Sequence, residues 1–351
     1  MHDHAKKRLV TMEKESPGAE RVLVVTNLWP TEDEPTYGIM VRRQVESLWE
    51  QGVPIDVLYV RGVESPLAYL SGAVLMLAWS LKPRRRYRLV HAHGGETLLA
   101  ARFYVRAPLL VSFMGADLLG ATREDGSLGR RWLLRTRVIR HLSRLARASI
   151  TKSAEMEAVL PSRVQRHNTV MPNGVDRRLF APLPQVEARA ELGWDVDERV
   201  VLFVGRTRVP RKRFGLARQA CEQAQRTLGP IRLHVAQGVN PEQIPILMSA
   251  ADCLLHPAAS EGSPNVVKEA LACDLPVIAT PVGDIPLLLD GVKECRTCPP
   301  TVDALGAALI DCLTYRRRSD GREKTKWLAH DYIAAALVAL YDELDATTSG
   351  A

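Results

Sequence analysis

Short apolar runs alternate with stretches of helical periodicity, and this alternation most constrains the fold. Residues 22–26 are rich in valine, residues 38–51 repeat apolar side chains at helical spacing up to Gly52, and residues 53–60 are again apolar. A strand, a helix and a strand in this order form a βαβ unit, whose two strands lie parallel. The pattern therefore predicts an α/β fold built on a parallel sheet.

The same alternation continues in two series, one on each side of a proline-rich stretch at residues 181–184. Further strands are predicted at residues 89–93, 109–113, 149–151 and 169–171 in the first series, and at residues 200–204, 231–236, 253–256 and 277–280 in the second. Such series build doubly wound sheets. We expect two Rossmann-like domains, at residues 21–182 and 183–325, after a disordered polar tail at residues 1–20.

Composition agrees with a two-domain protein, since the 351 residues are 46% hydrophobic and 25% charged. The longest apolar stretch, residues 67–81, falls short of the roughly 20 residues that cross a bilayer, and no signal-peptide pattern precedes it. We expect a cytoplasmic protein with reduced cysteines. Cys295 and Cys298 have a ligand-like spacing, but one such pair is half of a zinc site, so we expect no metal.

Charge is divided unevenly along the chain. Residues 1–180 hold 28 Lys and Arg against 18 Asp and Glu, whereas residues 181–351 hold 19 against 22. The first domain is thus biased toward an anionic partner such as a membrane surface, a lipid phosphate or a polyanionic acceptor. Nucleic acid is disfavoured, because the arginines are not interleaved with stacking aromatics and aromatic content is 5%.

Residues 130–147 predict an amphipathic helix with seven nearby arginines. Five apolar residues fall on or near one of its faces, namely Trp132, Leu134, Val138, Leu142 and Leu145. Two interpretations stay open. The helix docks on anionic lipid, or it packs this face on the core and leaves a solvated basic back.

The segment at residues 261–269 carries the most chemical information, because it places Glu261 and Glu269 eight residues apart around a predicted helix start. Ser263 is the predicted helix cap, and Pro264 suits the first helical position. The carboxylates can accept hydrogen bonds from sugar hydroxyls. The alternative is that both acids are ordinary solvated residues near a helix N-terminus, where the dipole favours them.

Free backbone N–H groups at Gly262, Ser263 and Asn265 would suit phosphate or sugar oxygens. With residues 249–257 and 275–280 around it, the segment resembles the paired-glutamate motif of retaining glycosyltransferases of family 4, which has seven residues between its two acids.

The resemblance covers roughly residues 20–345 and implies the GT-B fold, in which two Rossmann-like domains face a cleft. The first domain would bind the acceptor, the second a nucleotide-sugar donor, and a helix at residues 326–351 would return toward the first. The implied reaction transfers a sugar from a UDP- or GDP-linked donor to a carbohydrate or lipid-linked acceptor hydroxyl, in cell-surface polysaccharide, glycolipid or glycoconjugate synthesis. It needs no metal and no cofactor.

Residues 203–212 leave a predicted strand and enter a loop before a helix, which is where an α/β sheet binds phosphate. The resemblance assigns Arg206 and Lys212, after Gly205, to the donor diphosphate, Glu261 to the donor sugar, and Glu269 to the ribose. The family usually spaces the two basic residues one position closer, so Arg211 is the alternative to Lys212. A solvated basic loop is the other interpretation of this segment.

Three segments of the first domain also resemble the family. Gly38, within residues 35–39, would let the backbone approach the donor phosphates. Met114 stands where many members have a histidine, and nearby Asp117 is either an acceptor contact or a turn residue. Asn173, in a Pro-Asn-Gly-Val-Asp turn, could reach the cleft.

Asp195 and Asp197 have a spacing that holds divalent metals elsewhere, but a polar turn explains them better. Two other functions stay open. A sugar-nucleotide epimerase shares this fold but would need acid and base groups over the sugar, which Met114 makes less favourable. A non-catalytic partner subunit would bind nucleotide sugar weakly or not at all.

Overall fold

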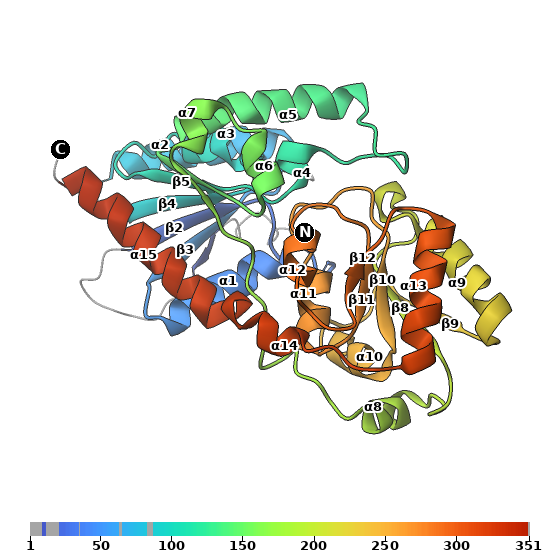
Figure 1. Ribbon diagram of the computed structural model, residues 1–351. Coiled ribbons are helices and arrows are strands. Elements are labelled where there is room, and N and C mark those ends of the chain that lie inside the picture. The colour runs from blue at the N-terminus through green and yellow to red at the C-terminus, as the bar shows by residue number, and fades with distance from the viewer. Residues whose placement is uncertain (1–8, 12–20, 35, 63–64, 83–86, 350–351) are drawn as a thin grey trace, which may run out of the picture. The chain divides into compact units, whose positions relative to one another are not determined.

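The computed structural model describes residues 9–11, 21–34, 36–62, 65–82 and 87–349, and Figure 1 shows its ribbon. The chain divides into two compact units. Unit 1 comprises Met1–Gly120, Leu133–Gly174 and His330–Ala351, and unit 2 comprises Ala121–Trp132 and Val175–Ala329. Each unit is an α/β domain around its own sheet, which confirms the predicted fold class.

Unit 1 contains a seven-stranded sheet in the order β1-β3-β2-β4-β5-β6-β7. Its strands are β1 (Leu9–Thr11), β2 (Arg21–Thr26), β3 (Ile55–Tyr59), β4 (Tyr87–His93), β5 (Leu109–Ser112), β6 (Ala148–Thr151) and β7 (Asn168–Val170). Strands β2 to β7 pair in parallel, as the apolar runs predicted. The edge strand β1 pairs antiparallel with β3, so the prediction of a wholly disordered tail is wrong for these three residues. The rest of residues 1–20 lies outside the described residues.

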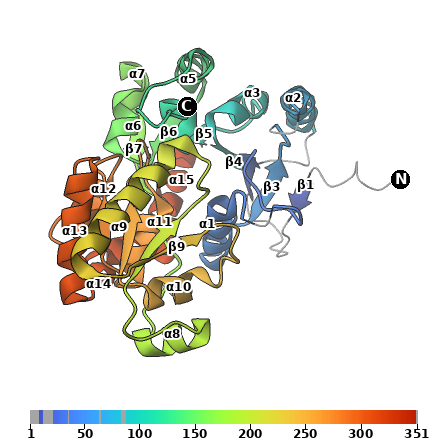
Figure 2. The ribbon, with the colours of Figure 1, turned by 90° about the vertical axis from the view of Figure 1, so that its right-hand side faces the viewer.

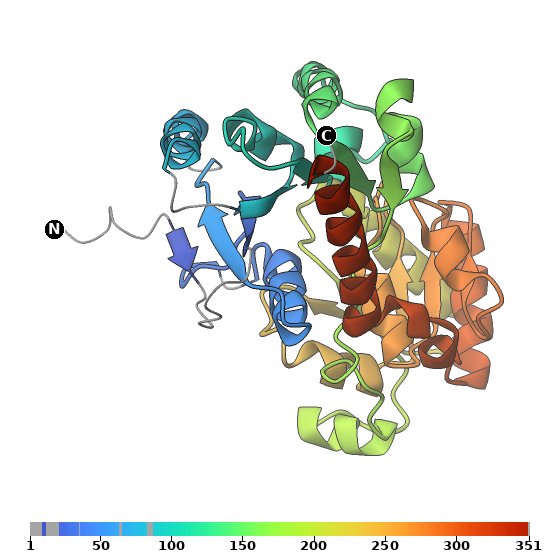
Figure 3. The same cartoon turned by 90° about the vertical axis from the view of Figure 1, so that its left-hand side faces the viewer.

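Helices cover both faces of the unit 1 sheet, because successive side chains of a strand point to opposite faces. In β2, Val22 and Val24 pack with α1 (Ile39–Glu50) and α15 (His330–Ser349). Leu23 and Val25 pack on the other side with Leu118 of α4 (Ala116–Leu119) and with five further helices. These are α2 (Leu67–Ser80), α3 (Leu98–Ala101), α5 (Arg130–Leu142), α6 (Ala154–Ala158) and α7 (Ser162–Gln165). Figure 3 shows the sheet of unit 1 between the two layers.

Helix α5 packs differently from the core-facing alternative raised by its sequence. The residues that it buries are Thr136 and Ile139, whereas Leu134 and Val138 of the expected apolar face are 65% and 47% exposed. Leu142 of the same face packs against the core, so the expected apolar face is divided between the core and solvent.

Unit 2 contains five parallel strands in the order β12-β11-β10-β8-β9. They are β8 (Val200–Val204), β9 (Arg232–Ala236), β10 (Cys253–His256), β11 (Val277–Ala279) and β12 (Arg296–Thr297). Four of them follow the predicted runs, and β12 was not predicted. One face is covered by α9 (Phe214–Leu228) and α13 (Val302–Tyr315), and the other by α10 (Ile244–Ala250), α11 (Asn265–Ala272) and α12 (Ile285–Leu289).

The chain returns to unit 1 at its C-terminal end. After α14 (Gly321–Lys324) and a 3₁₀ turn at Lys326–Leu328 in unit 2, α15 begins at His330. Helix α15 buries the side chains of Ile333, Leu337 and Tyr341 in the unit 1 core beside α1. Three separate pieces of chain therefore complete unit 1.

Candidate functional site

The predicted donor residues gather at the carboxyl edge of the unit 2 sheet. Strands β8 and β10 are parallel neighbours, with Cys253 opposite Val201, so the loops that follow them leave the same edge. The loop after β8 runs from Gly205 through a 3₁₀ turn at Pro210–Lys212, and the loop after β10 carries Glu261.

Glu261 is the centre of this arrangement. Its Oε1 accepts hydrogen bonds from Nη1 of Arg211 at 2.6 Å and from Nζ of Lys212 at 2.7 Å. Nε2 of His256, at the end of β10, lies 3.6 Å from the same oxygen. The Glu261 side chain is only 12% exposed. Two cations and one carboxylate are therefore held together in a largely buried cluster.

The charges of this cluster fix its protonation. Burial by itself raises the pKa of Glu261, but the nearby Lys212, His256 and Arg211 outweigh it and hold that pKa well below the ordinary value. Burial and the Lys212 charge lower the pKa of His256. At neutral pH the cluster consists of an ionised carboxylate, two cations and a neutral imidazole.

Arg206 lies apart from these contacts. Its side chain is exposed, and among the described residues it makes no ion pair or side-chain hydrogen bond. The preceding Gly205 has φ 141°, a conformation that glycine adopts readily. The structure thus brings Arg211 and Lys212 to Glu261, and leaves Arg206 at the start of the same loop with its guanidinium in solvent.

The loop from Gly262 to Asn265 is held differently from the sequence prediction. Helix α11 begins at Asn265, Pro264 occupies the cap position, and no side chain caps the helix. The predictions that Ser263 caps it and that Pro264 is its first residue are therefore wrong. Ser263 Oγ instead accepts a hydrogen bond from Nζ of Lys268 at 3.1 Å. The backbone conformation of Pro264 already supplies the turn, which leaves the hydroxyl available to Lys268.

Two ionisable residues beneath this loop escaped the sequence analysis. Lys268 is fully buried on α11, and burial lowers its pKa to about 8. Burial raises the pKa of Asp284 to about 6, while a hydrogen bond with Ser263 and the Lys268 charge oppose that rise. The available signal was a lysine inside the apolar run from Val266 to Leu271. Glu269, the second acid of the pair, is half-buried on the same helix.

In unit 1, Gly38 caps α1 with φ 71°. A Cβ atom there would lie 2.2 Å from the carbonyl carbon of Leu28, so only glycine fits against this backbone. Packing against Leu28 is by itself enough to require glycine at this position, whether or not a ligand approaches.

Asp117 is buried, and its carboxylate accepts hydrogen bonds from several backbone N–H groups. The donors are Gly95 at 2.9 Å, Met114 at 3.0 Å, Gly115 at 2.9 Å and Leu118 at 3.0 Å. Burial and the nearby charge of Glu96 raise its pKa, against the lowering effect of these bonds. Asp117 thereby ties the loop after β4 to the loop after β5.

The remaining unit 1 residues lie at the ends of their strands. Met114, after β5, is partly buried against the core that contains α15. Asn173 follows β7 and is half-buried. His91 in β4 is fully buried between Ser112 and Tyr341, at 2.8 Å and 2.6 Å, and burial lowers its pKa well below the ordinary value.

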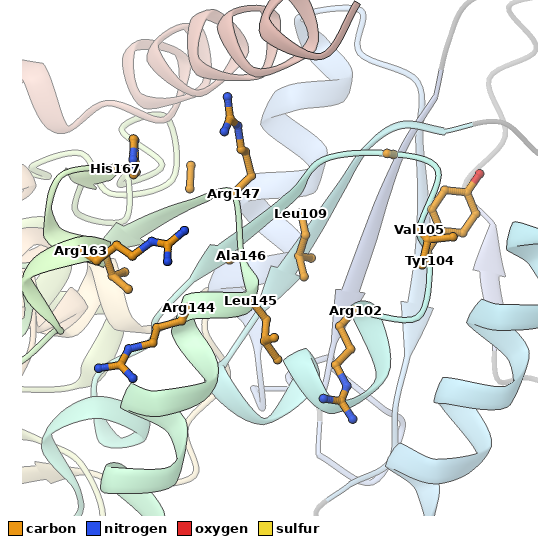
Figure 4. Close-up of a pocket in the computed structure, with 13 residues that line it drawn as sticks. Arg102, Tyr104, Val105, Leu109, Arg144, Leu145, Ala146, Arg147, Arg163 and His167 are labelled. Carbon is orange, nitrogen blue, oxygen red and sulfur yellow. The ribbon is translucent and has the colours of Figure 1, made fainter. Parts of the chain in front are cut away.

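A cavity of 410 Å³ in unit 1 involves none of the predicted donor or acceptor residues. It lies beside the first residues of β5 and β6, Leu109 and Ala148, at the end of the strands opposite to Met114. Figure 4 shows Arg102, Arg144 and Arg163 around it, from the turn after α3, the 3₁₀ turn at Ser143–Leu145 and α7.

No group of three or more His, Cys, Asp or Glu with metal-site geometry occurs in the part of the chain that the structure describes. Within the same residues, none of the helices has the length and apolar character needed to cross a bilayer.

Two models of known protein families match this chain. A model of Glycosyltransferase Family 4 matches residues 9–179, and a model of glycosyl transferases group 1 matches residues 202–315. The chain belongs to the family 4 glycosyltransferases. The resemblance stated from its motifs is thereby confirmed.

Two curated relatives of this glycosyltransferase are D-inositol 3-phosphate glycosyltransferases. The protein of Segniliparus rotundus is 33% identical over 147 residues, which cover 34% of this chain and 32% of that protein. The protein of Mycobacteroides abscessus is 28% identical over 331 residues, covering 82% and 72%. The chain thus spans about a third of the first relative and most of the second.

Solved structures of GT-B glycosyltransferases share the fold. Sucrose-phosphate synthase of Thermosynechococcus elongatus superposes with a TM-score of 0.75 at 20% identity, covering 93% of this chain and all of that one. Anabaena HepE in complex with UDP and glucose gives a TM-score of 0.68 at 18% identity, with the same coverage.

Proposed function

We propose that this glycosyltransferase moves a sugar from a UDP- or GDP-linked donor to an acceptor hydroxyl, with retention at the anomeric carbon. The observation that carries the proposal is the cluster of Arg211, Lys212 and Glu261 at the carboxyl edge of unit 2. Two cations suit the charge of a donor diphosphate, and a carboxylate suits the hydroxyls of a sugar.

Donor binding would exchange the partners of this cluster. Phosphate oxygens would accept the hydrogen bonds that Arg211 and Lys212 now donate to Glu261, and exposed Arg206 would join them. The released Glu261 carboxylate, kept ionised by its low pKa, would then accept hydrogen bonds from the donor sugar. Either Arg211 or Lys212 can serve as the second diphosphate ligand.

The transfer needs no protein nucleophile and no metal in this scheme. The acceptor oxygen forms its bond to the anomeric carbon on the face that the diphosphate leaves, and the leaving diphosphate takes the acceptor proton. Fixed cations stabilise the charge that builds up on the diphosphate. Glu269 on α11 would bind the ribose hydroxyls, and the backbone N–H groups of Gly262, Ser263 and Asn265 the oxygens of the donor.

Unit 1 would supply the acceptor side. We assign Met114 and Asn173 to acceptor contacts and Asp117 to holding the loop that carries Met114. Gly38 would let the backbone approach the donor phosphates. The acceptor would be a carbohydrate or a lipid-linked intermediate of surface polysaccharide, glycolipid or glycoconjugate synthesis, reached at the inner face of a membrane. UDP is the first donor nucleotide to test, because HepE of the same fold is bound to UDP.

The donor proposal is tested first by a thermal-shift titration with UDP, GDP and ADP and their sugars. A ligand that binds only the folded protein at a hundred times its dissociation constant stabilises it by about 2.7 kcal/mol. We expect a shift with one nucleotide sugar that Glu261→Ala reduces. The absence of a shift with every nucleotide sugar would favour a non-catalytic subunit, and conversion of donor without acceptor would favour an epimerase.

Turnover of the donor so identified then tests the loop after β8. Arg206→Ala should lower turnover on the order of a hundredfold, because it removes a cation from the leaving diphosphate. Arg208→Ala is the matched control, since Arg208 is also exposed in the same loop, and it should retain turnover. Near-normal kinetics of Arg206→Ala would remove that residue from the site. The larger loss between Arg211→Ala and Lys212→Ala would identify the second ligand.

A further inference from the structure

Helix α2 carries a continuous apolar stripe that contacts nothing in the core. Its members follow one another at three- and four-residue spacing and so lie on one helix face. They are Leu67, Leu70, Val74, Leu77 and Leu81, with exposed fractions of 72%, 64%, 63%, 45% and 71%. The opposite side of α2 buries Met76 and Trp79 in the core. A contiguous exposed apolar surface of this kind marks an interaction site.

A second stripe lies on α5 and the 3₁₀ turn that follows it, Ser143–Leu145. It consists of Leu133, Leu134, Val138 and Leu145, which are 52%, 65%, 47% and 47% exposed. Helices α2, α3 and α5 pack on the same face of the unit 1 sheet, so both stripes lie on the outside of one helical layer. Figure 2 shows the three helices side by side in that layer.

Helix α5 of this layer is strongly basic. Helices α2, α3 and α5 contain no aspartate or glutamate, and Arg130, Arg131 and Arg137 of α5 are exposed. Glu96, just before α3, is paired with Arg135 of α5. The other basic groups of the layer therefore keep their charge uncompensated by carboxylates on these helices.

The unit 1 cavity is lined by both basic and apolar residues. Arg102 and Arg144 extend on the same side as Leu145, whereas Arg147 points the other way (Figure 4). Val105, 76% exposed, lies at its rim. Neither Arg102 nor Arg144 forms an ion pair with a carboxylate of the described residues. Guanidinium groups beside exposed apolar side chains match a phosphate group above an acyl boundary.

We propose that the outer surface of α2, α3 and α5 docks on a bilayer of anionic phospholipid. The α2 stripe would lie in the plane of the interface, since its 14 residues are too few to span a bilayer. Arg102 and Arg144 would bind lipid phosphates. A second copy of the chain is a poorer occupant, because a twofold contact would place this arginine-rich surface against itself. The inference rests on the proposed transfer to a membrane-linked acceptor and names the surface that reaches it.

The test is co-sedimentation of the full chain with vesicles of phosphatidylcholine alone or mixed with phosphatidylglycerol. The wild type should bind the mixed vesicles more tightly, and Leu70→Ser/Val74→Ser should weaken binding at least tenfold. Leu287→Ser, at a 69% exposed leucine of α12 in unit 2, is the matched control and should bind like wild type. Arg102→Gln/Arg144→Gln should remove most of the preference for phosphatidylglycerol.

Three outcomes would overturn the docking surface. They are no binding of wild type to either vesicle, equal binding by the Leu70→Ser/Val74→Ser variant, and a dimer in solution that this variant abolishes. Thermal shifts with the donor nucleotide, measured on the same variants, separate the two proposals. A variant that loses vesicle binding but keeps the thermal shift with nucleotide is impaired in docking alone. A wild type that binds vesicles but no nucleotide contradicts only the proposed transfer.

Discussion

Lys268 supports the loop that carries Glu261 through a hydrogen bond to Ser263. Its ammonium group is fully buried, donates to Ser263 and lies near the carboxylate of Asp284. Burying an ammonium costs free energy, and the residue lies on a helix whose other buried side chains are apolar. We therefore expect a hydrophobic replacement to fold while changing how the protein responds to pH.

The pH response follows from the lowered pKa of Lys268. The folded protein releases this proton near pH 8, whereas the unfolded chain keeps it until about 10.5. Between these values the unfolded state binds more protons, so this residue makes the free energy of unfolding rise with pH. Relative to Lys268→Met, the wild type should gain on the order of 3 kcal/mol from pH 7.5 to 10.5. Urea unfolding of both proteins across that range measures it, and equal slopes would contradict the buried ammonium.

Gly38 offers a prediction with an internal control. Gly38→Ala places a Cβ atom 2.2 Å from backbone at Leu28 and keeps φ at 71°, so it should destabilise unit 1 by several kcal/mol. Gly52→Ala, at the other end of α1, has φ 81° but nothing within 4 Å. It should cost only about 1 kcal/mol for the left-handed conformation. Chemical unfolding compares the two, and equal losses would mean that the loop at Leu28 yields.

At the level of elements, α8 (Gln185–Leu192) is attached to the rest of unit 2 by hydrogen bonds from Gln185 and from the buried Arg189. Arg189 is 1% exposed and bonds both carboxylate oxygens of Asp252 at 3.1 Å, besides the carbonyl of Ala250 at 2.9 Å. Three more carbonyls, those of Asp195, Val196 and Glu198, accept from its Nη1. The same guanidinium therefore shapes the turn that the sequence predicted around Asp195 and Asp197.

Removing this guanidinium should be costly, because it leaves the buried carboxylate of Asp252 with one fewer cation. We expect Arg189→Met to lower the free energy of unfolding by about 3–5 kcal/mol. Arg218→Met, at a 64% exposed arginine of α9, should change it by less than about 0.5 kcal/mol. Guanidinium chloride unfolding provides the comparison. A loss below 1 kcal/mol would mean that Arg316, which also contacts Asp252, replaces it.

Most strands were predictable because a strand buried on both faces is a continuous apolar run, as β2, β8 and β10 are. The edge strands β1 and β12 were not, since each has two or three residues and no such run. Glu261 and Lys212 were identified from spacing and resemblance. The contact of Arg211, the support from Lys268 and the outward face of α5 depend on packing between segments distant in the sequence.

At the scale of the whole molecule, unit 1 is incomplete without the last helix of the chain. Deleting residues 330–351 removes Ile333, Leu337 and Tyr341 from its core and exposes the apolar face of α1 and the sheet. We expect the truncated chain to lose the cooperative unfolding of unit 1 and to retain that of unit 2. Calorimetry resolves the two unfolding transitions. The full-length variant Leu337→Ala is the less disruptive comparison, and it should lower the melting temperature of the unit 1 transition without abolishing it.

An intact first transition in the truncated chain would show that α1 and the sheet are self-sufficient. Nucleotide binding by that chain reports separately on unit 2, whose core contains no residue of α15.

The discontinuity of unit 1 also orders events during synthesis. A ribosome makes the chain from its N-terminus, so every segment of unit 2 has been synthesised before α15. The unit that begins first in the sequence is therefore the second to be finished. Until the twenty residues of α15 leave the exit tunnel, the nascent chain carries an uncovered sheet face that is prone to aggregation.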